Sequence, residues 1–149
     1  MVDACTPFAL HSTDPQPFWV SRMAIQLNHT IVPARDPHAS ARFLAEILGC
    51  SQPQAFGPFY GVGLDNGVTL DFMHSDGKPR SQHYAFLVSE PEFDEIFARI
   101  QKRRLPYWAD PDHRHRGEIN HRDGGRGLYW DDPNGHNLEI LTRPYGSGG

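Results

Sequence analysis

Apolar and polar residues alternate along several short stretches of the chain, and this alternation predicts β-strands. In residues 23–32, the odd positions from 25 to 31 fall on one face, and His29 is the polar residue among aliphatic ones. Residues 82–88 repeat the pattern, with His83 on a face that also carries alanine and leucine. Each of these two strands therefore places one histidine on an otherwise apolar face.

Two other stretches follow the spacing of amphipathic helices. Asp36 is expected to cap the first helix, with Pro37 in its first turn and Gly49 at its end. Ser89 and Glu92 have the spacing of a capping box at the start of the second helix. Each helix has one apolar stripe, so we expect each to pack by that stripe on the rest of the fold.

Asn–Gly pairs predict two β-hairpins, one over residues 59–74 and the other over residues 127–141. In the second strand of each hairpin, an acidic residue lies between aliphatic or aromatic neighbours: Asp71 in the first hairpin and Glu139 in the second. These two carboxylates therefore occupy equivalent places.

Strand, helix and hairpin thus occur twice in the same order, which predicts an internal repeat. The first module covers residues 23–76 and the second covers residues 81–143, within one domain. Residues 1–22 lack a sustained period and are expected to form an N-terminal arm, and residues 144–149 are expected to form a tail.

Composition excludes several classes of function. The 149-residue chain has a net charge of −4, which gives no electrostatic signature of nucleic-acid binding. Its apolar runs are too short to cross a membrane, and its first residues do not resemble a signal peptide. Cys5 and Cys50 lie far apart and form no metal-binding pair. We therefore expect a reduced, cytoplasmic protein.

Residues 108–126 have no apolar period and are dense in Asp, His, Arg and Gly. Such a segment is either a disordered loop or a functional lid. Its histidines His113, His115 and His121 offer an alternative metal site, but a flexible loop would present no fixed geometry to an ion.

Three segments together resemble the vicinal oxygen chelate superfamily: residues 28–30 (Asn-His-Thr), residues 83–86 (His-Tyr-Ala-Phe) and residues 132–140 (Asp-Pro-Asn-Gly-His-Asn-Leu-Glu-Ile). This superfamily includes glyoxalase I, extradiol dioxygenases, fosfomycin-resistance thiol transferases and bleomycin-resistance proteins. The similarity covers about residues 23–143. It implies an α+β fold in which two βαβββ modules form a cupped mixed sheet.

By position, the resemblance implies that His29, His83 and Glu139 bind one divalent metal ion. Two imidazoles and one carboxylate suit Fe, Mn, Ni, Co or Zn, and they leave positions open for substrate and water. Asp71 takes the fourth symmetric place, where glyoxalase I-like members have a glutamate ligand. Because Asp is one methylene shorter, Asp71 holds the metal through water, orients a ligand or contacts the substrate.

Such a centre implies an enzyme, a lyase, dioxygenase or transferase, that binds two vicinal oxygens of a small-molecule substrate. Glu139 and Asp71 are the candidate catalytic carboxylates. Arg126 is a candidate clamp for a carboxylate or phosphonate, and Tyr129 and Trp108 are candidate walls of an aromatic pocket. The resemblance also implies a homodimer.

Two alternatives remain open. One is a metal-free protein of the bleomycin-resistance type that binds or sequesters a small molecule. The other is a fosfomycin-resistance-like thiol transferase, to which residues 83–93 are similar. The intact His/His/Glu set favours a metal-dependent enzyme over the binder, since a binder has no need of these ligands.

Overall fold

A computed structural model describes residues 25–148, and within them the predicted repeat is confirmed. The first module comprises β1 (His29–Ala34), α1 (Pro37–Leu48), β2 (Gln54–Phe56), β3 (Phe59–Gly63) and β4 (Thr69–His74). The second comprises β5 (His83–Leu87), α2 (Glu90–Lys102), β6 (Tyr107–Trp108), β7 (Gly127–Asp131) and β8 (Asn137–Leu141), with a short 3₁₀ helix, η1 (Arg122–Gly124), before β7. The predicted N-terminal arm lies outside the described residues.

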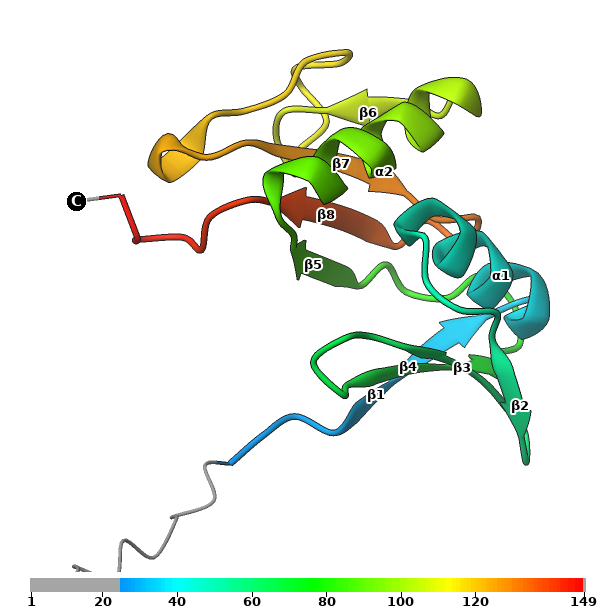
Figure 1. The fold of residues 1–149 in the computed structure, drawn as a ribbon. Coiled ribbons are helices and arrows are strands. Elements are labelled where there is room, and N and C mark those ends of the chain that lie inside the picture. The colour runs from blue at the N-terminus through cyan, green and yellow to red at the C-terminus, as the bar shows by residue number, and fades with distance from the viewer. Residues whose placement is uncertain (1–24, 149) are drawn as a thin grey trace, which may run out of the picture.

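Each module forms its own four-stranded mixed sheet, in the order β1-β4-β3-β2 and β5-β8-β7-β6. The α+β fold is therefore confirmed, and within one chain the strands make two sheets whose edge strands include β1 and β5 (Figure 1). The first and last long strands of each module pair in parallel, and the other pairs are antiparallel.

The two modules also share their register. His29 lies opposite Thr69 in the β1–β4 pair, and His83 lies opposite Asn137 in the β5–β8 pair. Asp71 and Glu139 each follow two residues after the histidine's partner, so the equivalence expected between these carboxylates holds in the sheet pairing. The first predicted strand is shorter than expected, because pairing with β4 begins at His29 and not at residue 23.

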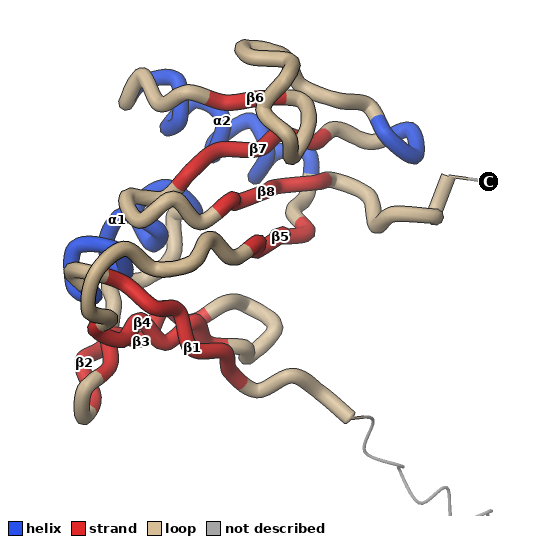
Figure 2. The backbone as a smooth tube through the Cα atoms, turned by 180° about the vertical axis from the view of Figure 1, so that it is seen from behind, coloured by secondary structure: helices blue, strands red, loops and turns tan. Residues whose placement is uncertain are grey.

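Helices α1 and α2 lie beside each other on one face of the sheets, and the strands lie in front of them when the molecule is seen from behind (Figure 2). Their predicted caps are present: Asp36 accepts a hydrogen bond from the Ala39 amide, and Ser89 and Glu92 form the capping box. Neither helix of the described chain is long and apolar enough to cross a membrane.

Strand alternation separates the core from the face that the helices leave uncovered. On β4 and β8 the buried residues Leu70, Phe72, Leu138 and Ile140 point toward the helices and join one core cluster drawn from both modules. Asp71 and Glu139 lie between them in sequence and therefore point to the uncovered face.

A buried polar turn, residues 132–136 between β7 and β8, joins the second module to the first. The Asp132 carboxylate accepts hydrogen bonds from the amides of Asn134 and His136, each at 2.8 Å, and from Nδ2 of Asn134 at 2.9 Å. Asn134 in turn reaches the first module: its Oδ1 accepts from the Arg35 amide at 3.0 Å, and its Nδ2 donates to Oγ of Ser40 at 2.9 Å.

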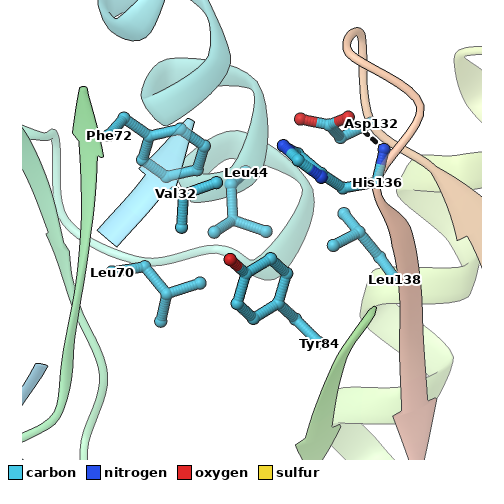
Figure 3. Close-up of a pocket in the computed structure, with 8 residues that line it drawn as sticks. All are labelled: Val32, Leu44, Leu70, Phe72, Tyr84, Asp132, His136 and Leu138. Carbon is cyan, nitrogen blue, oxygen red and sulfur yellow. Dashed lines mark hydrogen bonds between the residues drawn. The ribbon is translucent and has the colours of Figure 1, made fainter. Parts of the chain in front are cut away.

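His136 makes the second connection between the modules. Its Nδ1 accepts a hydrogen bond from the Gln82 amide at 3.0 Å, so Nε2 carries the proton and donates to the carbonyl oxygen of Pro33 at 2.8 Å. The ring lies beside a small cavity of about 10 Å³, lined by side chains of both modules (Figure 3). A cavity of this size holds a single water molecule at most, so it is no substrate site.

We expect Asn134→Ala to lower the free energy of unfolding by about 2–3 kcal/mol, because it leaves the Arg35 amide and the Ser40 hydroxyl without their partner. Urea denaturation followed by circular dichroism measures the change. Asn66→Ala is the matched control: Asn66 is exposed and makes one local bond, so the loss should stay below about 1 kcal/mol. Equal losses in the two variants would show that the turn does not hold the modules together.

Candidate metal centre

His83 and Glu139 lie side by side on the uncovered face of the second sheet. They extend from the neighbouring strands β5 and β8, and Nε2 of His83 is 3.2 Å from Oε2 of Glu139. The Glu139 side chain is buried, with 1% of its surface exposed, whereas the His83 side chain is 48% exposed. Of these two predicted ligands, Glu139 therefore lies inside the protein, whereas His83 borders the solvent.

Hydrogen bonds determine where the lone pairs of this pair point. Nδ1 of His83 lies 2.9 Å from the carbonyl oxygen of Asn137, which can only accept, so Nδ1 carries a proton and in the neutral imidazole Nε2 has the lone pair. Oε2 of Glu139 has no hydrogen-bond partner among the described residues, although Nε2 is near.

Nε2 and Oε2 can each donate a lone pair, and they are close enough to bind one cation together. Two neighbouring ligand atoms, each about 2.1 Å from a metal ion, are roughly 3 Å apart, close to the observed separation. A histidine that donates its other ring N–H to a backbone carbonyl is also the usual arrangement for a metal ligand. His83 and Glu139 therefore fit two adjacent positions around a divalent metal.

The other oxygen of Glu139 is held by tyrosines. Tyr145 donates a hydrogen bond from its hydroxyl to Oε1, and the hydroxyls of Tyr129 and Tyr145 lie 2.7 Å apart. Because the Tyr145 proton is used on Glu139, Tyr129 is the donor to Tyr145. Burial raises the pKa of Tyr129 well above its usual value, and the neighbouring Tyr145 hydroxyl and Glu139 carboxylate raise it further, so the phenol stays protonated.

The Tyr129 ring also stacks near the His83 ring: the two centroids lie 6.0 Å apart and the ring planes differ by 27°. Trp108 lies opposite Tyr129 in the β6–β7 pair and hence on the same face of the sheet. The structure thus places Tyr129 beside the His83–Glu139 pair and Trp108 one strand further along the same face. Their contact with substrate stays a prediction.

The loop over residues 108–126 has a defined conformation and packs on this face. The ring of His113 stacks on Trp108 at 3.8 Å, and its Nε2 lies 3.4 Å from Oδ1 of Asn137 and 3.6 Å from Oδ1 of Asp131. The segment therefore packs at the strand ends next to His83, and its function as a lid stays a prediction.

Asp110 organises that loop. Its carboxylate accepts hydrogen bonds from the amides of Asp112, Arg114 and His115 and from Nδ1 of His115. Burial alone would raise the pKa of Asp110, but these hydrogen bonds outweigh it and lower the pKa to about 2. The carboxylate is therefore charged at neutral pH and keeps its partners.

His29 is not brought to the pair within one chain. It is exposed at the start of β1, where its Nδ1 lies 2.9 Å from Oδ1 of Asn28. Across residues 25–148, no group of three or more His, Cys, Asp or Glu side chains is arranged to hold a metal ion. This finding covers the loop histidines His113, His115 and His121 as well. One chain therefore offers two of the three predicted ligands together.

Asp71 is buried, with 5% of its surface exposed, and its Oδ1 lacks a hydrogen-bond partner among the described residues. Asp71 and the Phe56 ring both border Gly61: a methyl group there would lie 3.1 Å from Oδ1 of Asp71 and 2.8 Å from the Phe56 ring. No contact within 4 Å joins His29 and Asp71 as it joins His83 and Glu139. The catalytic role of Asp71 remains a prediction.

Arg126 points to the helix-covered side. Its guanidinium bonds the carboxylates of Glu90 and Asp94, each at 2.6 Å, and lies 4.3 Å from the Phe93 ring. The hydrogen bond with Asp94 raises the pKa of Arg126, and the one with Glu90 adds to this. Arg126 thus joins the start of β7 to α2, and a role in binding an anionic substrate stays a prediction.

Sequence reasoning missed Tyr145. It falls in residues 144–149, which were expected to be a tail, and no periodic pattern marks it. The one available signal was an aromatic residue close in sequence to the β8 carboxylate, which is too common to indicate a contact.

Comparisons with known proteins show what this chain is similar to as a whole. Among solved structures, the chain is similar to the oxidase ChaP-H2, with 65% identity, a TM-score of 0.83, and coverage of 85% of this chain and 100% of that one. It is similar to the oxidase ChaP-H1 at 66% identity, with a TM-score of 0.81 and coverage of 83% and 99%.

Other relatives are more distant. The metallothiol transferase FosB of Lysinibacillus sphaericus (strain C3-41) is 28% identical over 126 residues, which cover 80% of this chain and 84% of that protein. A family model described as the Glyoxalase/Bleomycin resistance protein/Dioxygenase superfamily matches residues 26–140. The chain therefore belongs to the Glyoxalase/Bleomycin resistance protein/Dioxygenase superfamily.

Proposed function

We propose that this protein is a divalent-metal-dependent enzyme that oxidises a small molecule, with the metal bound by His83, Glu139 and His29 of a second copy of the chain. The observation that carries the proposal is the closeness of His83 Nε2 and Glu139 Oε2, which lie 3.2 Å apart while Oε2 has no hydrogen-bond partner among the described residues. A metal-free binding protein would have no reason to hold these atoms so.

Two histidines and one carboxylate form the ligand set of non-haem Fe(II) oxygenases, so Fe(II) is the expected metal. When bound, it supplies a Lewis acid with open positions for two vicinal oxygens of the substrate. The chain's own side chains hold the metal and flank the substrate. His83 and Glu139 fix the site, and Trp108 and Tyr129 flank the substrate from the same sheet face.

The third ligand has to come from a second copy, since His29 lies in the other sheet of its own chain. β1 and β5 are edge strands, whose free backbone groups favour pairing with another strand. Apolar side chains near these edges are exposed: Leu27 is 66% exposed and Leu87 is 61% exposed. A symmetric homodimer would cover these edges and complete two equivalent sites.

Oxidation is favoured over thiol transfer by the degree of similarity. The two solved relatives named as oxidases are 65% and 66% identical to this chain, whereas the thiol and glutathione transferases are 28% and 26% identical. Proteins with higher sequence identity more often share a reaction class, so this similarity favours oxidation over thiol transfer.

We expect the protein, purified without a tag or chelator, to retain about one divalent ion per chain, and His83→Ala to lose it. Elemental mass spectrometry measures the content. His74→Ala is the control, because His74 is an exposed histidine on β4 whose ring contacts Arg35 and Asp76 and neither proposed ligand. A parent protein that holds no metal after reconstitution, or a His83→Ala variant that holds as much as the parent, contradicts the proposal.

Co-expressed His29→Ala and His83→Ala chains test whether His29 acts across the dimer. Each variant alone lacks a ligand at every site, but a mixed dimer regains one complete site. Random pairing should therefore restore metal to roughly a quarter of all sites. The metal content of the mixture is measured beside that of each variant. If the mixture binds no more metal than the single variants, the three ligands do not combine across two copies.

Oxygen uptake distinguishes the reaction classes. The Fe(II)-loaded protein should consume dioxygen with at least one member of a panel of compounds bearing vicinal oxygens, and the Zn(II)-loaded protein should not, because Zn(II) has no redox chemistry. An oxygen electrode records the rate. Addition of glutathione to fosfomycin, with no oxygen uptake on any compound, would instead make the protein a thiol transferase.

A further inference from the structure

We infer that Tyr145 is a positioning residue for Glu139, which holds the carboxylate so that one oxygen alone is free for the metal. This inference rests on the proposed function, since it concerns the same centre. It adds a residue that lies beyond the matched family region, residues 26–140.

The two oxygens of Glu139 have different surroundings. Oε1 accepts the hydrogen bond of the Tyr145 hydroxyl, whereas Oε2 has no partner among the described residues and faces His83. The hydrogen bond to Oε1 takes up one acceptor site there and so favours metal binding through Oε2. The orientation of the Glu139 carboxylate is then fixed in the metal-free protein.

Tyr145 is itself held in place from behind. The Tyr129 hydroxyl lies 2.7 Å from the Tyr145 hydroxyl and, as the donor, leaves the Tyr145 proton directed at Glu139. Since Glu139 is 1% exposed, water does not replace this contact easily. Tyr129, Tyr145 and Glu139 therefore form one chain of hydrogen bonds that ends at the free oxygen.

The backbone around Tyr145 is also fastened to the rest of the module. Arg143 donates to the carbonyl oxygen of Asp123 at 3.0 Å, and the Gly148 amide donates to Oδ1 of Asp123 at 3.2 Å. These bonds fix the segment on both sides of Tyr145 to η1, and the Arg122 guanidinium lies 6.0 Å from the Tyr145 ring. The contacts of residues 143–148 thus hold the Tyr145 hydroxyl against Glu139, the proposed metal ligand.

The experiment compares Co(II) binding by the parent protein with binding by Tyr145→Phe, which removes only the hydroxyl. We expect the Co(II) affinity of Tyr145→Phe to fall about tenfold, as for other residues that orient a metal ligand. The visible absorption of bound Co(II) should also change, because the carboxylate is free to turn. A chelating dye in competition gives the affinity. Tyr129→Phe should show a smaller loss, since its hydroxyl acts through Tyr145.

Tyr107→Phe is the matched control. Tyr107 lies next to Trp108 on β6, but its ring packs on Phe97 of α2 at 5.1 Å, on the helix-covered face. Its loss of a hydroxyl should change the Co(II) affinity by less than about twofold. Thermal unfolding of the metal-free variants separates positioning from folding.

Three results would overturn the inference. Parent-like Co(II) affinity and absorption in Tyr145→Phe would show that the hydroxyl does not position Glu139. A lower unfolding temperature of the metal-free variant, with no change in Co(II) affinity or spectrum, would show that the hydroxyl serves folding alone. A parent protein that binds no Co(II) would overturn the metal centre itself, and the inference with it. The first two results leave the proposed function standing, so the two failures are distinguishable.

Discussion

The hydrogen bonds of the turn at residues 132–136 connect the two modules next to the strand that carries the proposed metal ligand Glu139. Asn134 and His136 bind backbone groups of the first module, and His136 immediately precedes β8. The same turn therefore sets the position of the second sheet against the first and the start of the strand that carries Glu139. The carbonyl oxygen of Asn137 accepts a hydrogen bond from Nδ1 of His83, so the orientation of the histidine also depends on this strand.

The two modules share a backbone plan but not a chemistry. In both, the histidine begins the first strand and the carboxylate follows its partner by two residues. In the second module the side chains lie 3.2 Å apart, whereas in the first no such pair joins His29 and Asp71. The repeated framework thus carries a pair of proposed metal ligands in one module and an exposed histidine in the other.

Much of this arrangement could be predicted from the sequence. Alternation and capping signals gave both helices and the long strands, and the equivalence of Asp71 with Glu139 was visible in their flanking residues. β2 and β6 were not predicted, because strands of two or three residues are too short to show a period. Arg126 was interpreted as an anion clamp since nothing in a linear sequence shows that Glu90 and Asp94, one helical turn apart, both face it. Tyr145 could not be predicted, because its contact depends on how a non-repeating segment folds back.

The separation of His29 from His83 and Glu139 within one chain has a thermodynamic consequence for the proposed centre. If one ion bridges two copies, metal binding and association are linked, and each strengthens the other by the same factor. The apparent affinity for the metal then depends on protein concentration, and the apparent affinity between copies depends on the free metal. Scarcity of the ion would disperse the subunits, and dilution of the subunits would release the ion.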